Sequence, residues 1–398
     1  MSWNFLCNST QADLKFTFYD SIYLVPEQAW NHVLQGKNIY LELDYLKAME
    51  KSLEGEMEFR YVVFYCQENT PVAIAANQVV NFTSEKFEDQ FPKGIQSVQA
   101  KLLKHLSLKV LVCGNLFATG QNGFAFIDEL DPEMAYRNLC VAMYKLRRSE
   151  NFEDSPINLI LMKEFWPEST THLEVLKDNG YRNFQIDVNM VLKMHPDWKT
   201  FEDYMSSMVS KFRTKAKSVM KRSSALSVQE FGMPELEEHK NHMFELYKNV
   251  TEQADFNFAS LNAESFLGLK KALDDKFNVT GYFVDNQLVG FKTAFITGQF
   301  VDANYVGLDY TKNQDYSVYQ RMLYDLVKLT IENGGKELRL GRTAEQIKSC
   351  LGAEPIHMDL LLKHKNTLSN QLIKPLIDSV SPSEFELRNP FKADFKLA

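Results

Sequence analysis

Hydrophobic and polar residues alternate along this chain in two characteristic patterns. Short apolar runs and period-two alternation predict strands, whereas apolar positions three and four residues apart predict helices. In the first half, these patterns predict helices at 26–34, 43–52, 132–148 and 172–179, a β-hairpin formed by 59–66 and 71–80, and strands at 109–113, 157–163 and 181–193.

The second half repeats this order of elements. The patterns predict a hairpin at 277–284 and 288–297, a strand at 299–308, a helix at 317–332 and a strand at 337–340. A chance recurrence of α/β order is the alternative to a duplication, but the matched hairpin lengths favour duplication. We therefore expect two similar α/β units, residues 1–196 and 197–398, which meet near His195 and Pro196.

Composition limits the class of protein. With 398 residues, 45% hydrophobic and 13% aromatic, the chain has enough apolar material for large cores, which excludes a mainly disordered protein. The formal net charge of -8 predicts that any nucleic-acid contact is confined to a local patch. The start of the chain lacks the pattern of a secretory signal, and no apolar run is long enough to span a membrane. These features predict a cytoplasmic protein.

Cysteine and histidine spacing gives no sign of a metal centre. The five cysteines (Cys7, Cys66, Cys113, Cys140 and Cys350) are scattered and form no close C-x-x-C pair. That pattern predicts reduced thiols rather than disulfides or a zinc site. We expect no metal cofactor.

One segment is strongly basic. Residues 211–222 contain Lys211, Arg213, Lys215, Lys217, Lys221 and Arg222 without an acidic residue. On a helix, Arg213, Lys217 and Lys221 would share a face and repel one another. Glu235, Glu237 and Glu238 could neutralise such a face. Otherwise, Arg213 and Lys217 are candidates for binding a phosphate or carboxylate.

A second candidate follows the strand at 337–340. Gly341 leaves the strand, and Arg342 and Lys348 come shortly after it, at the strand end where α/β sheets commonly receive ligands. We expect both cations to contact an anionic part of a substrate. A turn with exposed basic residues would give the same pattern.

The order of several short motifs resembles a known superfamily. These motifs are Ser210–Arg213 with Lys217 and Arg222, 288–291, 305–309, 319–329, 340–343 with Lys348, and 351–353. In this order the chain resembles the GNAT-like acyltransferases, and it is most similar to the branch that holds BioF/CelD-like acetyltransferase domains and Fem-type peptidoglycan aminoacyl transferases. The resemblance covers residues 200–360, while the first half resembles the degenerate partner domain of tandem members.

The resemblance implies an α/β (α+β) fold of tandem GNAT-like domains, each a mixed, mostly antiparallel sheet flanked by helices. It also implies a splayed sheet that admits an acyl thioester, acyl-CoA or acetyl-CoA, with backbone N–H groups of strand 301–308 polarising the acyl carbonyl. The donor's pyrophosphate would lie near Lys312, Asn313, Gln314 and Ser317. That loop contains no glycine, unlike the usual Arg/Gln-x-x-Gly-x-Gly/Ala, whereas the corresponding loop of the first half contains Gly114, Gly120 and Gly123.

Acyl transfer also needs groups that move protons. Placement on or beside strand 301–308 makes Tyr305 the candidate general acid and Asp302 or Asp309 the candidate base. The leading hypothesis is an acyltransferase that moves an acyl group from acyl-CoA to an amine or hydroxyl of a small molecule or cell-wall precursor. An aminoacyl-tRNA-dependent Fem-like transferase and a non-catalytic GNAT-like binding protein are the alternatives. The sequence does not define an oligomeric state.

Overall fold

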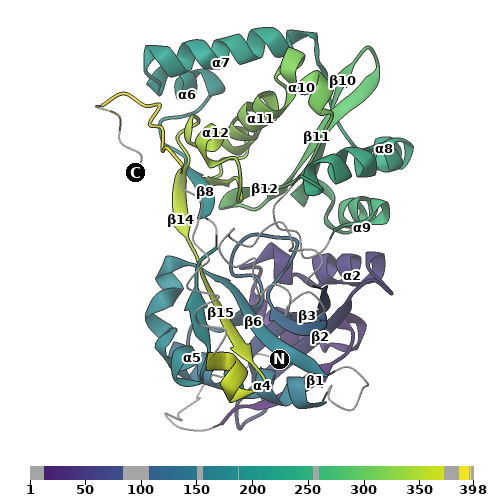
Figure 1. Ribbon diagram of the computed structural model, residues 1–398, viewed down its shortest axis with the longest axis vertical. Helices are drawn as coiled ribbons and strands as arrows, with labels where there is room; N and C mark the ends of the chain where they lie inside the picture. Colours follow the sequence, from purple (N-terminus) through teal and green to yellow (C-terminus); the bar gives the residue numbers. More distant parts are fainter. Residues whose placement is uncertain are drawn as a thin grey trace, which may run out of the picture. The chain divides into compact units, whose positions relative to one another are not determined.

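Two compact units make up the chain in the computed structural model, which describes residues 13–83, 107–149, 156–186, 188–253, 260–371, 385–393 and 395. Unit 1 comprises Met1–Ile186 with Met358–Ser381, and unit 2 comprises Asp187–His357 with Pro382–Ala398. Each unit contains a mixed, mostly antiparallel sheet flanked by helices, as the sequence predicts (Figure 1).

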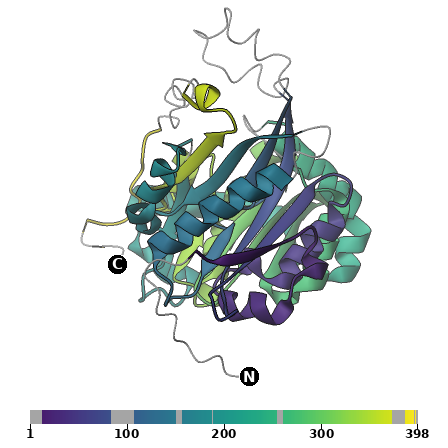
Figure 2. The same cartoon turned by 90° about the horizontal axis from the view of Figure 1, so that it is seen from below.

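Unit 1 is built on an eight-stranded sheet with the order β1-β2-β3-β4-β6-β15-β7, in which β5 also pairs with β3. The helix α4 lies across one face of this sheet (Figure 2) and buries an apolar side that includes Leu139, Met143 and Leu146. The elements are β1 Lys15–Tyr19, α1 Glu27–Leu34, α2 Leu43–Ser52, β2 Glu58–Tyr65, β3 Pro71–Thr83, β4 Ser107–Cys113, β5 Phe124–Phe126, α4 Pro132–Ser149, β6 Ile157–Phe165, α5 Glu174–Asp178, β7 Arg182–Phe184 and β15 Asp359–His364.

Unit 2 is built on a seven-stranded sheet with the order β14-β8-β13-β12-β11-β10-β9. The helices α8 and α9 pack on strands β10 to β12, while α6, α7 and α11 share a core with Met190, Val301 and Leu338. The elements are β8 Val188–Lys193, α6 Phe201–Ser207, α7 Ser210–Arg222, β9 Ser227–Glu230, α8 Met233–Thr251, α9 Ala263–Leu273, β10 Phe277–Val284, β11 Gln287–Ile296, β12 Phe300–Leu308, α10 Tyr310–Tyr316, α11 Val318–Glu332, β13 Glu337–Arg339, α12 Glu345–Ser349 and β14 Glu354–His357.

The two sheets exchange a strand. β8 follows β7 along the chain but pairs with β13 and β14 of unit 2, and β15 follows β14 but pairs with β6 and β7 of unit 1. The division therefore falls after Ile186, ten residues before the expected boundary at 196, and 358–381 return to unit 1. The segment 181–193, expected as one strand, is two strands in different sheets. Apolar periodicity marks a buried strand but does not specify which sheet it joins.

Candidate functional site

The central strands of unit 2 part from each other soon after they meet. The parallel neighbours β12 and β13 pair only through Phe300–Asp302 and Glu337–Arg339. Beyond this point β12 continues against β11, whereas the chain after β13 stays along β8, where the Leu340 N–H donates to the Met190 carbonyl at 2.8 Å. We call the point just after Asp302 and Arg339 the fork.

The corresponding strands of unit 1 do not part in this way. Along their described residues, β4 and β6 are paired from Lys109 to Cys113 on one strand and from Ile157 to Met162 on the other. Of the two parallel pairs among the described strands, the one in unit 2 opens after three residues and the one in unit 1 does not. The fork therefore distinguishes unit 2 from unit 1.

A bulge in β12 lies beside the fork. The register between β11 and β12 shifts between Lys292 and Ala294, and Thr293 holds the displaced backbone. Its hydroxyl oxygen accepts a hydrogen bond from the Tyr305 N–H at 2.8 Å and donates one to the Tyr305 carbonyl at 3.1 Å. The extra residue redirects the β12 backbone where its pairing with β13 has ended.

The structure brings Asp302 and Tyr305 to this region. Asp302 is 2% exposed and lies in register with Arg339, so the two side chains share one face of the sheet. The buried ring of Tyr305 packs edge-on against Tyr247, Phe266 and Phe295. Both predicted residues thus lie on β12, within or beside the fork.

Asp309 has a structural role. It is the N-cap of α10, where its carboxylate accepts hydrogen bonds from the Thr311 N–H at 2.8 Å and the Thr311 hydroxyl at 2.6 Å. Partial burial raises the pKa of Asp309, but the hydrogen bonds from Thr311 and Lys312 outweigh it and hold the pKa below its ordinary value. A carboxylate with a lowered pKa is a weaker base.

The expected pyrophosphate loop is a helix. Lys312, Asn313 and Gln314 lie within α10, and Ser317, at a φ of 53°, joins α10 to α11. The Asn313 side-chain oxygen accepts a hydrogen bond at 2.9 Å from the N–H of Tyr319, in the first turn of α11. An amide that a donor phosphate would use is thus already bonded to the protein. The expectation of a loop here is wrong, because a capping residue and a helical pattern replace the glycines.

The basic segment is helical, and described carboxylates do not neutralise its positive charges. It forms α7, on which Lys217 is exposed and Arg213 half-buried. Within the described residues, none of its six cations forms an ion pair with a carboxylate. Glu235 instead accepts a hydrogen bond from the N–H of Gly232, and Glu237 pairs with Lys240 at 3.4 Å. Neither carboxylate neutralises α7.

Arg342 lies in the turn after β13 and Lys348 on α12, but Lys348 faces inward. The Lys348 side chain is buried, and its ammonium donates hydrogen bonds to the carbonyls of Gly341 at 3.3 Å and Arg342 at 2.5 Å. Burial lowers the pKa of Lys348 to about 7, although nearby Glu345 opposes this shift. Lys348 therefore holds the turn after β13, and half-buried Arg342 remains the member of the pair that can reach a ligand.

The glycine-containing loop of unit 1 is fixed by buried internal bonds. Lys163 and Glu164 form an ion pair at 2.8 Å with both side chains buried, and Lys163 also donates to the Ala118 carbonyl at 2.7 Å. A Cβ atom at Gly123 would lie 2.2 Å from the Gly114 nitrogen, so the backbone is closely packed. This loop is therefore closed upon itself rather than arranged around a phosphate.

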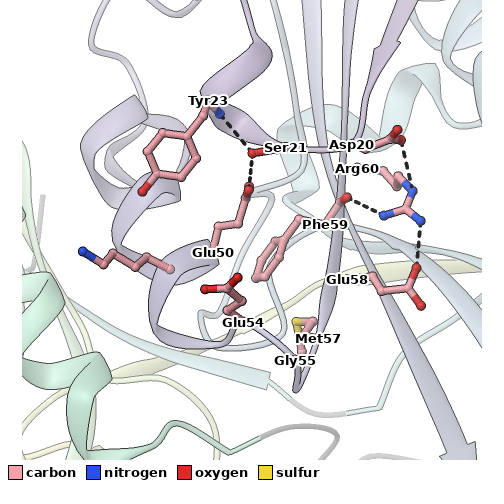
Figure 3. A pocket seen from close by; sticks show the side chains of 11 residues that line it. Asp20, Ser21, Tyr23, Glu50, Glu54, Gly55, Met57, Glu58, Phe59 and Arg60 are labelled. Atoms are coloured by element: carbon pink, nitrogen blue, oxygen red, sulfur yellow. Dashed lines mark hydrogen bonds and ion pairs between the residues drawn. The ribbon is translucent and has the colours of Figure 1, made fainter.

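A cavity of about 560 Å³ lies in unit 1 beside α2 and β2, and Figure 3 shows the side chains that line it. Sequence patterns gave no indication of it, because its carboxylates come from separate elements. Glu50 accepts hydrogen bonds from Ser21 and Tyr61, and Arg60 pairs with Glu58 at 2.7 Å. These lining groups bond mainly to one another, and none of the predicted site residues lies among them.

The described residues contain no group of three or more His, Cys, Asp or Glu side chains that could hold a metal ion. Of the cysteines, Cys7 lies outside the described residues, and the other four are free thiols. None of the described helices is both long and apolar enough to cross a bilayer.

No protein-family model matches the sequence, and no curated protein matches it. Solved structures do resemble it. FemX is 12% identical, with a TM-score of 0.53 over 83% of this chain and 94% of that chain. A tandem GNAT protein from the clavulanic acid biosynthesis pathway is 9% identical, with a TM-score of 0.51 over 88% and 99%.

This chain has the tandem GNAT fold. At these identities the likeness concerns the fold, and it confirms the resemblance to GNAT-like and Fem-type proteins at that level. The C-terminal domain of a putative lysylphosphatidylglycerol synthetase from Agrobacterium fabrum is also similar, at 9% identity and a TM-score of 0.48 over 89% of this chain and 95% of that chain.

Proposed function

We propose that the chain is an acyltransferase whose reacting centre lies at the fork of unit 2. The carrying observation is the three-residue pairing of β12 with β13, after which the β12 backbone continues beyond Asp302 without pairing to β13. Backbone N–H groups directed into such a gap can polarise an acyl carbonyl and stabilise the oxyanion that forms. Unit 1, whose parallel pair stays together, has no equivalent opening among its described residues.

In the proposed reaction, an amine or hydroxyl of the acceptor attacks the acyl carbon. The bond from that carbon to the sulfur or oxygen of the donor then breaks, and the leaving group takes up a proton. Asp302 accepts the proton from the nucleophile, and Tyr305 donates one to the leaving group. Asp302 is preferred to Asp309 because the capping bonds of Asp309 lower its pKa.

The first candidate donor is acyl-CoA or acetyl-CoA, and the acceptor is a small molecule or a cell-wall precursor. Because Asn313 occupies the Tyr319 amide, the diphosphate of such a donor cannot use that amide. We propose that four basic side chains contact the anionic groups of the donor or acceptor. These are Arg213 and Lys217 on α7, Lys312 on α10 and Arg342 after β13. Two further proposed donor-binding residues are Gln314, on α10, and Ser317, which joins α10 to α11.

The second candidate donor is an aminoacyl-tRNA. One observation favours it: α7 presents six cations that form no ion pair with a described carboxylate. A polyanion would supply the missing negative charge, and its binding would weaken steeply as salt displaces the contacts. The net charge of -8 predicts that such a contact is local, and α7 is the patch that we propose for it.

Two binding measurements separate these donors. If acetyl-CoA is the donor, it raises the melting temperature of the protein, because a ligand that binds the folded state stabilises it. If aminoacyl-tRNA is the donor, it binds with a strong salt dependence that Lys217→Gln reduces, while Lys271→Gln on α9 serves as the exposed control. A protein that binds and consumes neither donor would be a non-catalytic binding protein, and the proposal would fail.

A further inference from the structure

Unit 1 carries a second group of basic side chains, which the reaction above does not use. Arg147 and Arg148 lie at the end of α4, Lys363 and His364 end β15, and Lys365 follows. They are distant in sequence, but α4 packs against α5, and the carbonyl of Asn179 at the end of α5 accepts a hydrogen bond from Lys363. The charge of Arg147 accordingly acts on both Lys363 and His364. We call these five residues the basic cluster.

Aromatic rings and a carbonyl contact three members of the basic cluster. The Arg147 guanidinium lies 5.3 Å from the centre of the Tyr144 ring, and Arg148 donates a hydrogen bond to the Tyr144 hydroxyl at 3.1 Å. The Lys363 ammonium donates to the Asn179 carbonyl at 2.6 Å and lies 5.3 Å from the Tyr181 ring centre. These neighbours stabilise cations without cancelling their charge.

The cluster lacks a negative partner. Among the described residues, no carboxylate forms an ion pair with any of the five, and the buried Nε of Arg147 has no hydrogen-bond acceptor. Burial lowers the pKa of Arg147, Lys363 and His364, and neighbouring cations of the cluster lower each of them further. The C-terminal dipole of α4 offsets this cost for Arg147 and Arg148 only in part. The folded protein thus holds several positive charges at one place at a cost in stability.

We propose that the basic cluster binds the phosphate group of a small anionic ligand. Arginine offers planar, paired N–H donors that match two phosphate oxygens, and Lys363 adds a point charge from a different element. A bound phosphate would supply the missing negative charge. Unit 1 would then be a ligand-binding unit, which does not depend on the transferase activity proposed for unit 2.

Acidic residues of the chain are the alternative to phosphate as partners of the basic cluster. Glu150, Glu153 and Asp154 follow α4 directly in the sequence but lie outside the described residues. If these acids neutralise the cluster, an added phosphate would gain little. A variant that replaces all three by their amides separates this case from the proposal.

Pyrophosphate and inorganic phosphate are the probes. We expect each to raise the melting temperature of the full chain above that in sodium chloride of equal ionic strength. Lys363→Gln and Arg148→Gln should each raise the apparent Kd for pyrophosphate about tenfold in calorimetric titration. Arg148 is exposed, so its variant should fold even if a change at Lys363 proves disruptive. Lys177→Gln on α5, an exposed lysine paired with Glu174, is the matched control and should bind as the parent does.

Three results would overturn the proposal. The first is that pyrophosphate has no more effect than sodium chloride. The second is equal binding by the parent and both cluster variants. The third is binding that appears only after Glu150, Glu153 and Asp154 are replaced, because those acids would then be the native partners. None of these outcomes depends on acyl transfer, so failure of the transferase proposal leaves this test intact.

Discussion

The side-chain oxygen of Asn313 accepts a hydrogen bond at 2.9 Å from the backbone N–H of Tyr319. This bond joins α10 to the first turn of α11, where GNAT-like resemblance places the pyrophosphate of the donor. The Tyr319 N–H lies at a helix N-terminus, where an anion would bind well, but it is already hydrogen-bonded to the side chain of Asn313.

Replacing Asn313 with alanine tests this relationship. The Tyr319 N–H would lose its partner, and we expect a loss of stability of about 1 kcal/mol, typical of a lost capping bond. The same change should increase the rise in melting temperature that coenzyme A produces, because an amide becomes available for its phosphates. Lys271→Ala, an exposed change on α9, is the control. Equal responses of both variants to coenzyme A would show that Asn313 does not block a phosphate.

The proposed proton transfers predict the effect of changes on β12. Asp302→Asn and Tyr305→Phe should each lower kcat by about 100-fold, since each removes a proton-transfer group. Asp309→Asn weakens a cap, so it should lower stability more than turnover. Steady-state kinetics with whichever donor binds, together with thermal unfolding, measures both effects. Unchanged turnover in Tyr305→Phe would remove the phenol from the mechanism.

Lys292 predicts a pH dependence of stability. Its ammonium is buried, donates to Thr280 at 3.1 Å and Asn278 at 3.3 Å, and burial lowers its pKa from 10.5 to about 8. Between these two pH values the unfolded chain binds more protons than the folded one, so Lys292 makes stability rise with pH. This rise should be on the order of 3 kcal/mol.

A methionine at position 292 isolates this contribution. The free energy of unfolding of Lys292→Met should exceed that of the parent most at and below about pH 8, and this difference should shrink toward pH 10.5. Urea unfolding across this pH range measures the difference in the free energy of unfolding. Lys271→Met, an exposed change in unit 2, should follow the parent. A constant difference between Lys292→Met and the parent would contradict the assignment.

Gly307 lets α8 approach the β12 backbone. A Cβ atom there would lie 2.2 Å from Phe291 Cε1 and 2.8 Å from Leu246 Cβ. We expect Gly307→Ala to lower the free energy of unfolding by about 1–3 kcal/mol through overpacking. At Gly298 a Cβ atom would meet nothing within 4 Å, so Gly298→Ala should change stability by less than about 0.5 kcal/mol. Similar losses in both variants would rule out the packing explanation.

Local chemistry explains which elements could be predicted. The turn between β10 and β11 contains Asp285 and Asn286 with φ of 49° and 64°, a left-handed pair typical of tight hairpins, and the sequence places the hairpin there. The helical spacing of apolar residues likewise locates α4 and α11. Patterns of this kind depend on neighbours in sequence, so they can be recognised without the fold.

Site chemistry was only partly predictable. Asp302 and Tyr305 could be proposed because both lie on one recognisable strand, and α7 because its charges are consecutive. The inward position of Lys348 could not be predicted, because a lysine that follows a strand is expected to be exposed. The bond from Asn313 to Tyr319 could not either, because it requires α10 to be helical.

Two α/β units, their hairpins, most of their helices and the uneven distribution of charge could be predicted from the amino-acid sequence. Only the three-dimensional fold shows that β8 and β15 join the sheets of different units, that β12 leaves β13 after Asp302, and that the charge of Arg147 acts on Lys363. The physical reason is that strand pairing and charge clusters join residues distant in sequence. Their free energy depends on which strand lies beside which, and local periodicity carries no record of that choice.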